Sequence, residues 1–555
     1  MLRGVAAAAA VVTALVLAAP AAADPVFVPT TKTAPPPGYL LNAGEAIAVA
    51  KQTPQYERTL RAHPGLRVYA YTNGQARWQV SGFAGRKELV QVLVDDRNGR
   101  VTEAWTGPQV AWKMARGYPG AFGRSVNSPW IWIPLCVLFV APFFDPRRPF
   151  RLLHLDLLVL LSFGVSHFFF NRGEISTSVP LVYPVLAYLL VRMLFAGFRP
   201  RPARGPLIPL APTWLLVAGV LLLTGFRIGL NVIDSNVIDV GYAGVIGADR
   251  IEHGRDIYGT FPRDNEHGDT YGPANYLLYV PFELAEPWDG SWAKLGSANG
   301  AAIGFDLITA AGLFLLGMRM RAGPAGRRLG AGLAWAWVTF PYALFVLETN
   351  ANDALVSAAL VLALLALSRP VLRGIAVGVG AAAKFVPLAL APLLAAGAGA
   401  HRGRREALLF GVTTAAVIAV LVFPFLPDGG VREMWQRTIG YQAGRMTPFS
   451  IWGQHESLGW LQDALKSAAI GLALLVAFVP RRRNIAQVAA LGAAVLLALQ
   501  ISGGYWFYLY VAWFAPLVFV ALFAPHMQEA GPRPALPLEA EADRAPPAEA
   551  APALS

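Results

Sequence analysis

The strongest constraint on the fold is a series of apolar runs that extends from about residue 130 to residue 524, with short basic or polar breaks between the runs. A run of about 20 apolar residues is long enough to cross the hydrocarbon core of a bilayer as a helix. Only 14% of the 555 residues are charged and 55% are hydrophobic, whereas soluble domains carry about 25% charged residues. The composition therefore predicts a multi-pass membrane protein and excludes a disordered chain, a disulfide scaffold and a single large soluble domain.

The apolar runs predict an all-α membrane domain over residues 126–525 with about thirteen transmembrane helices. The segments lie at 130–144, 152–170, 178–198, 208–229, 299–318, 329–348, 353–368, 373–386, 387–399, 406–425, 464–480, 485–502 and 505–524. The two segments that flank Lys384 and Pro387 are short, which favours a broken or re-entrant helix there. Asp306 falls inside an apolar run and needs a partner, which the sequence does not name.

Residues 1–23 have the layout of a secretory signal peptide. Arg3 precedes an apolar stretch at 5–19, and small residues follow before Asp24. An uncleaved membrane anchor is the alternative. In both cases we expect the next residues to begin outside the cytoplasm.

Residues 24–125 predict a small exported α+β domain. Their pattern indicates a helix at 43–50 and strands at 66–71, 76–83, 88–95 and 100–105. Trp78-Gln79-Val80 and the segment 92–101 resemble the small PepSY-like fold. The resemblance implies a role in protein contact or inhibition rather than catalysis, and hence an envelope protein as a partner. Cys136 is the single cysteine, so no intrachain disulfide can form.

The positions of the basic residues predict the orientation in the membrane. The formal net charge is +12, which on a soluble protein would suggest nucleic acid. Here nineteen arginines fall in the six loops that a signal peptide would leave inside, in agreement with the positive-inside rule. We therefore expect no nucleic acid partner, a cytoplasmic C-terminus with a disordered tail at 526–555, and extracytoplasmic segments at 24–129 and 230–297.

The loop at 230–297 contrasts with the rest of the chain because it is acidic. It holds eleven acidic residues against four basic ones. Asp234 and Asp239 stand where a span meets the outer interface, and a partly desolvated carboxylate there would have a raised pKa and could act as a base. The alternative is a solvated loop that is acidic only because it is exported.

Three motifs in this loop resemble a known family. Asp239-x-x-Tyr242, Gly254-x-x-x-Tyr258 and Thr270-Tyr271-Gly272-Pro273 are similar to the first outer loop of GT-C superfamily glycosyltransferases that use polyprenyl-phosphate sugars. The likeness is closest to family 87, the actinobacterial mannosyltransferases. Segments 348–353, 373–387 and 503–516 fit the family pattern in the same order, so the resemblance covers about 208–524. Two departures are three additional spans before the matched part and Thr349-Asn350 in place of the usual Gly-Gln.

The resemblance implies roles for individual residues. Asp239 is the expected general base, with Asp234 as the second candidate. Phosphate-binding candidates are Lys384, Arg445 and His455; substrate-binding candidates are Tyr242, Asp269, Tyr271, Asn350, Asn352 and Asp353. For each basic residue an ordinary role stays open: a lysine reaching the interface, a loop ion pair, and a packed loop histidine. Metal ions and cofactors are not expected.

The implied function is inverting transfer of a sugar, most simply mannose, from polyprenyl phosphate to a lipid or glycan acceptor on the outer face of the cell membrane. A transporter or a flippase for lipid-linked sugars is the alternative, although no internal repeat is present. A non-catalytic envelope scaffold is the third reading. The aromatic candidates for stacking on a sugar, or for the interfacial aromatic belt, are Trp452, Trp460, Tyr505, Trp506 and Tyr508.

Overall fold

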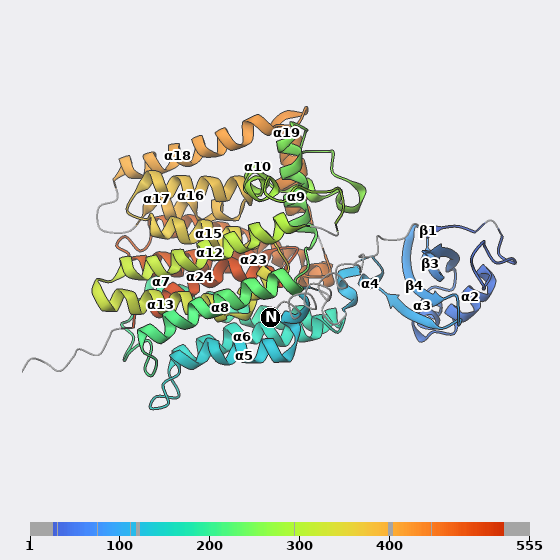
Figure 1. Ribbon diagram of the computed structural model, residues 1–555, viewed down its shortest axis with the longest axis horizontal. Helices are drawn as coiled ribbons and strands as arrows, with labels where there is room; N and C mark the ends of the chain where they lie inside the picture. The colour runs from blue at the N-terminus through green and yellow to red at the C-terminus, as the bar shows by residue number, and fades with distance from the viewer. Residues whose placement is uncertain are drawn as a thin grey trace, which may run out of the picture.

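The computed structural model describes residues 26–526, with the exception of residues 30, 75, 112, 118–121, 293–294, 398–402 and 446. A large helical body carries a small domain of helices and strands at one end (Figure 1). The signal peptide expected at 1–23, and all but the first residue of the tail expected at 526–555, lie outside the described residues.

The N-terminal domain (residues 26–106) is an antiparallel sheet of five strands in sequential order. Its elements are β1 (Val26–Phe27), α2 (Ala43–Lys51), α3 (Pro54–Ala62), β2 (Arg67–Asn73), β3 (Arg77–Ala84), β4 (Lys87–Asp95) and β5 (Val101–Thr106). The predicted helix and the four predicted strands are present. The sequence pattern did not predict α3, which begins at the Thr53 cap, or the two-residue strand β1.

Asp96 connects the sheet of the N-terminal domain to the chain that precedes α2. Its carboxylate is 2% exposed and accepts hydrogen bonds from the backbone N–H groups of Leu40 and Leu41 at 2.6 and 2.9 Å. The indole N–H of Trp78, which is fully buried, donates to the same carboxylate at 2.9 Å. One buried carboxylate thus satisfies three donors from two parts of the domain.

We predict that Asp96→Ala destabilises the N-terminal domain by about 3 kcal/mol or more, because hydrogen bonds to a charged group contribute about 1.5–3 kcal/mol each and three donors would lose their acceptor. Limited proteolysis of the full chain would measure the change. Asp95→Ala is the matched control, because Asp95 caps an exposed turn through the backbone N–H of Arg97. Equal protease sensitivity of the two variants would contradict the prediction.

The helical body is built from apolar helices. Among the described residues, seven helices are long and apolar enough to cross a membrane. They are α6 (Leu152–Phe170), α7 (Ile175–Phe198), α8 (Thr213–Asp234), α12 (Gly296–Met320), α18 (Arg404–Val422), α22 (Gly459–Phe478) and α23 (Ile485–Ser502). The helices α13 (Gly323–Thr339) and α14 (Pro341–Glu348) form a further candidate span that is bent by 55°. The shorter apolar helices are α5 (Pro129–Val140), α15 (Asp353–Leu365), α16 (Pro370–Ala383), α17 (Ala391–Ala396) and α24 (Val511–Phe523).

Each of the thirteen predicted segments overlaps one of these helices or the bent pair. The predicted break near Lys384 is present: α16 ends at Ala383, and a 3-10 turn, η6 (Val386–Leu390), leads into α17. Several of the helices are shorter than a bilayer crossing requires, so the number of crossings stays a prediction. The helical, membrane-embedded character of the body follows from its apolar helices.

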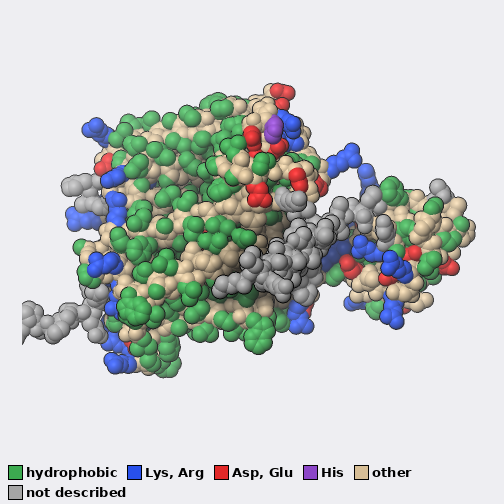
Figure 2. Space-filling model, viewed as in Figure 1, with side chains coloured by type: hydrophobic (Ala, Val, Ile, Leu, Met, Phe, Trp, Pro, Cys, Tyr) green, Lys and Arg blue, Asp and Glu red, His purple; other side chains and the backbone are tan. Residues whose placement is uncertain are grey.

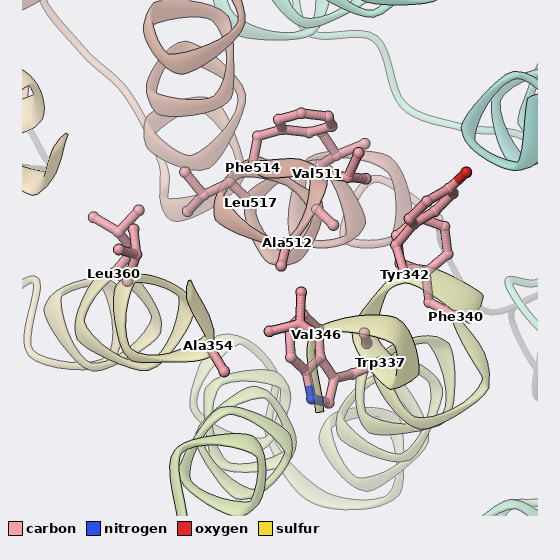
Figure 3. Packing of buried hydrophobic residues seen from close by; sticks show 14 of the residues in the cluster. Trp337, Phe340, Tyr342, Val346, Ala354, Leu360, Val511, Ala512, Phe514 and Leu517 are labelled. Carbon is pink, nitrogen blue, oxygen red and sulfur yellow. The ribbon is translucent and has the colours of Figure 1, made fainter. Parts of the chain in front are cut away.

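The centre of the body is formed by α13, α14, α15 and α24. Figure 3 shows Phe340 and Tyr342 near the bend between α13 and α14, and Val346 of α14 opposite Ala512 of α24. Tight packing of large rings holds short helices that would be marginal alone.

Asp306 of α12 has its partners inside this core. The guanidinium of Arg227 on α8 forms an ion pair with its carboxylate, and the indole N–H of Trp337 donates to it at 2.9 Å. A buried carboxylate among apolar helices is retained when an opposite charge and hydrogen bonds satisfy it. The partner that the sequence could not name is therefore Arg227.

Lys and Arg side chains gather at the end of the body that points away from the N-terminal domain (Figure 2). Acidic side chains gather near the other end, around α9 (Asp239–Glu252) and α19 (Gly430–Trp435). The two ends therefore carry opposite charge character.

Candidate active site

The loop between α8 and α9 brings Asp239 to the first position of α9. This loop is held on the turn that joins α14 to α15. The backbone N–H of Asn236 donates to the carbonyl of Glu348 at 3.0 Å, and that of Ile238 donates to Thr349 at 3.1 Å. These bonds fix the backbone immediately before Asp239.

Asn350 supports the same loop from the turn. It is fully buried and has a φ of +50°, a conformation that Asn tolerates better than most residues. Its side-chain amide donates to Ser235 Oγ at 2.9 Å and to the Asn236 carbonyl at 3.2 Å. Gly241 in α9 lies so close that an added Cβ would be 2.3 Å from the carbonyl oxygen of Asn350. Asn350 therefore positions the loop that carries Asp239.

Lys384 lies at the break between α16 and η6, where its backbone is extended. The ammonium Nζ is 2.7 Å from Oδ1 of Asp353, the first residue of α15. The indole N–H of Trp513 donates to the same oxygen at 2.7 Å. Nζ also lies 5.3 Å from the ring centroid of Tyr271 and 5.5 Å from that of Trp513, within reach of cation–π attraction.

The Tyr271-Gly272 segment packs against the end of α16. The backbone N–H of Gly272 donates to the Ala383 carbonyl at 3.0 Å, and an added Cβ at Gly272 would lie 2.0 Å from the carbonyl oxygen of Ala382. The hydroxyl of Tyr258 donates to the Tyr271 carbonyl at 2.9 Å. Tyr258 and Gly272 belong to two of the loop motifs, and both therefore help to place the Tyr271 ring beside Lys384.

Arg445 adds a second cation surrounded by aromatic rings. Its guanidinium carbon lies 4.2 Å from the ring centroid of Tyr505 and 5.9 Å from that of Tyr441. Tyr505 contacts Tyr510 with ring centroids 5.8 Å apart, and Tyr510 stacks on Trp513 at 4.0 Å. A continuous row of rings therefore connects Arg445 to the pair of Lys384 and Asp353.

Electrostatic coupling joins Asp239 to these groups. Burial raises the pKa of Asp239, the backbone N–H of Val240 and the charges of Arg445 and Lys384 oppose the rise, and Asp353 adds to it. The side chain of Asp239 is nevertheless exposed to solvent. We call Asp239, Tyr271, Asp353, Lys384 and Arg445 the Asp239 cluster. Burial followed by the Asp239 and Asp353 charges raises the pKa of Tyr271.

Asp234, the second candidate base, has other partners. Its carboxylate accepts hydrogen bonds from the hydroxyl and the backbone N–H of Ser125, and Oδ1 lies 3.8 Å from Nη1 of Arg124. The backbone N–H of Gly123 donates to Asn236 Oδ1 at 2.6 Å. Asp234 and Asn236 therefore tie the segment after the N-terminal domain to the loop that carries Asp239.

Tyr242 and Asp269 also lie in structural contacts of the loop. Tyr242 is buried, stacks on Trp292 at 4.5 Å and donates from its hydroxyl to Asp264 at 3.3 Å. Asp269 accepts from the backbone N–H of Gly259 at 2.8 Å and pairs with Arg437 at 3.0 Å. Both side chains therefore have partners outside the Asp239 cluster: Trp292 and Asp264 for Tyr242, and Gly259 and Arg437 for Asp269.

Two further candidates are not part of the Asp239 cluster. His455 is exposed at the end of α21 (Ile451–Gln454). Asn352 is buried, and its amide donates to Asn275 Oδ1 at 2.7 Å.

Of the aromatic candidates, some lie beside the Asp239 cluster and others lie elsewhere. Tyr505 lies beside Arg445, whereas Trp506 and Tyr508 are buried and the Tyr508 hydroxyl bonds to Ser166 and Ser178. Trp452 is buried, and Trp460 is 70% exposed.

Sequence reasoning missed the site contributions of Tyr510 and Trp513. Their spacing of three residues on one helical segment places both rings on one face, which is the signal that could have identified them. Asn265 was also missed; its side-chain amide donates to the Asp239 carbonyl at 2.9 Å.

Comparison with known families supports an enzyme. Residues 270–525 match the family model of glycosyltransferase family 87. This match supports a glycosyltransferase, which acts on a sugar donor and an acceptor. A search of curated proteins found no match to the chain. The matched region includes Tyr271, Asp353, Lys384 and Arg445; Asp239 precedes it.

We predict that Asp353→Ala lowers stability by about 3 kcal/mol or more, because it leaves the buried Lys384 ammonium without its counter-ion. Thermal unfolding of the purified protein in detergent would measure the loss. The double variant Asp353→Ala with Lys384→Met should recover a large part of it, since no unpaired charge remains. Additive losses from the two single substitutions would show that the pair is not coupled in this way.

Proposed function

We propose that the chain transfers a sugar from a polyprenyl-phosphate donor to a lipid or glycan acceptor at the outer face of the membrane, with inversion at the anomeric carbon. The observation that carries the proposal is the Asp239 cluster itself. It combines a carboxylate that water can reach, two cations and a row of aromatic rings, at the end of the bundle where the acidic loop gathers. The match to glycosyltransferase family 87 supports the same reaction class.

Asp239 is the proposed general base. The acceptor hydroxyl gives its proton to the carboxylate while its oxygen attacks the anomeric carbon of the donor sugar. The bond from that carbon to the phosphate oxygen breaks, and polyprenyl phosphate leaves with the bonding electron pair. A carboxylate with a raised pKa is a better proton acceptor than an ordinary one at neutral pH.

Lys384 and Arg445 are the proposed phosphate partners. The Lys384 ammonium has three donors, and among the described residues one of them bonds to Asp353. Positive charge next to the leaving phosphate stabilises the negative charge that develops in the transition state. The rings of Tyr271, Tyr505 and Trp513 offer apolar faces for the sugar. Mannose is the proposed sugar because the family resemblance is closest to mannosyltransferases.

We predict that Asp239→Asn lowers kcat for mannose transfer from polyprenyl-phosphate mannose by about a thousandfold, since general-base catalysis contributes about 10²–10⁴-fold. Transfer of radiolabelled sugar in isolated membranes measures this effect. Asp234→Asn is the matched control and should lower kcat much less, because Asp234 is engaged by Arg124 and Ser125. Loss of activity in Asp234→Asn alone would move the base to Asp234.

The raised pKa of Asp239 predicts the acid limb of the pH profile. Protonation removes the base, so kcat/KM should fall as the pH falls through a value above the ordinary carboxyl pKa of about 4. Arg445 opposes the rise, and Arg445→Gln should therefore move the limb to higher pH. A limb that stays in place would show that Arg445 does not act on Asp239.

The donor and the acceptor can be identified together in a strain that lacks the gene. Lipid and glycan profiling should reveal a structure without its sugar, and an active-site variant such as Asp239→Asn should fail to restore it. Flux of a lipid-linked sugar in proteoliposomes without any glycosyl product would instead indicate a transporter.

A further inference from the structure

A cavity lies at the end of the helical body opposite the Asp239 cluster. Its volume is about 920 Å³. It is lined by the first residues of α6 and α23, the last residues of α7 and α24, and the segment 199–204. The helix α8 separates this segment from Asp239 along the chain; its 22 residues span about 33 Å. The cavity is therefore a separate place in the fold.

The lining of this cavity is strongly basic. Six arginines contribute to it and one carboxylate, Asp156, accompanies them. The arginines are Arg151, Arg192, Arg199, Arg201, Arg204 and Arg321. We call this place the arginine cavity.

The single carboxylate of the arginine cavity is already neutralised. Asp156 pairs with Nε of Arg192 at 3.0 Å and accepts from the Tyr188 hydroxyl at 2.8 Å. Arg151 lies 3.7 Å from Asp145, which is outside the lining. Within the described part of the chain, Arg199, Arg201 and Arg204 have no ion pair, and Arg321 bonds to the Ala524 carbonyl. Four positive charges thus face the cavity without a counter-ion.

The same excess of positive charge acts on His526 in the lining. Its pKa is lowered to about 4, first by burial and then by the charges of Arg151, Arg321 and Arg192. The arginine charges act in the same direction as burial, so the cavity disfavours a further positive charge on His526.

Apolar residues also line the arginine cavity; we call its arginines the basic rim and its apolar residues the walls. Leu153, Ala196, Met320, Ile485 and Leu522 line it. Because α6 begins and α7 ends beside it, the rim is at the level where apolar helices give way to arginine-rich segments. Basic pockets at helix ends with apolar walls fit lipid head groups, whose phosphate meets the rim while the acyl chains meet the walls.

We propose that the arginine cavity binds the phosphate of an anionic phospholipid. Two other anions have the chemistry to compete for it. Soluble phosphate would use the rim and leave the apolar walls without a partner. Residues 527–555 carry five acidic and two basic residues and begin directly after His526, so this tail is the other competitor. The combination of a basic rim with apolar walls favours the lipid.

The test uses the purified full-length chain, with lipid binding counted by native mass spectrometry and by the shift in melting temperature. Phosphatidylglycerol and phosphatidylcholine serve as anionic and neutral probes. The triple variant Arg199→Ala, Arg201→Ala, Arg204→Ala should bind phosphatidylglycerol at least about tenfold more weakly, since each basic residue contributes on the order of 1 kcal/mol. All three side chains are exposed, so the variant should fold. Arg201→Glu is a second, single-site variant with the same expected direction.

The matched control removes three exposed arginines outside the arginine cavity. Arg405→Ala, Arg481→Ala, Arg482→Ala causes the same loss of charge and should leave lipid binding within about twofold. Equal weakening in both triple variants would overturn the proposal. So would equal binding of both lipids, equal stabilisation by glycerol phosphate, or binding that appears only after residues 527–555 are removed.

Discussion

The ion pair between Lys384 and Asp353 is the interaction on which the candidate site depends. Removing a lysine and a carboxylate from water costs several kcal/mol per ion unless close pairing and hydrogen bonds compensate. Here the 2.7 Å contact and the Trp513 indole supply that compensation. The pair joins the break after α16 to the first turn of α15, and it brings α24 to the same point through Trp513. Three helices are thus fixed at the candidate site.

The position of Asp239 is set from both sides of a short loop. The turn at Glu348–Asn350 holds the loop by backbone and amide hydrogen bonds, and the segment that follows the N-terminal domain holds it through Asp234 and Asn236. A general base must be placed within hydrogen-bond reach of the proton that it removes. A loop with two independent supports provides that accuracy better than a loop tethered at its ends alone, and one of these supports is the segment that follows the N-terminal domain.

The sequence predicted the apolar helices, the break at Lys384 and the strands of the N-terminal domain, because each leaves a local pattern: a long apolar run, a Lys-x-x-Pro interruption, or alternation along a strand. It grouped Asp239, Lys384, Asp353 and Tyr271 only through a family resemblance. Their convergence depends on helix packing between distant segments, which periodicity does not encode. For the same reason it missed Arg227 as the partner of Asp306, and it could not distinguish Tyr505, beside Arg445, from Trp506 and Tyr508 in the core.

The basic residues have different surroundings at the two ends of the protein, and these surroundings suit the different roles proposed for them. Near Asp239 there are two cations, Lys384 and Arg445, each beside aromatic rings. Such cations have limited freedom, which suits the recognition of a phosphate in one orientation. In the arginine cavity the guanidinium groups are more numerous, more exposed and largely without carboxylate partners. Such a rim suits an anion that is abundant and chemically variable, as membrane phospholipids are. The net charge of the chain does not distinguish the basic residues near Asp239 from those of the arginine cavity.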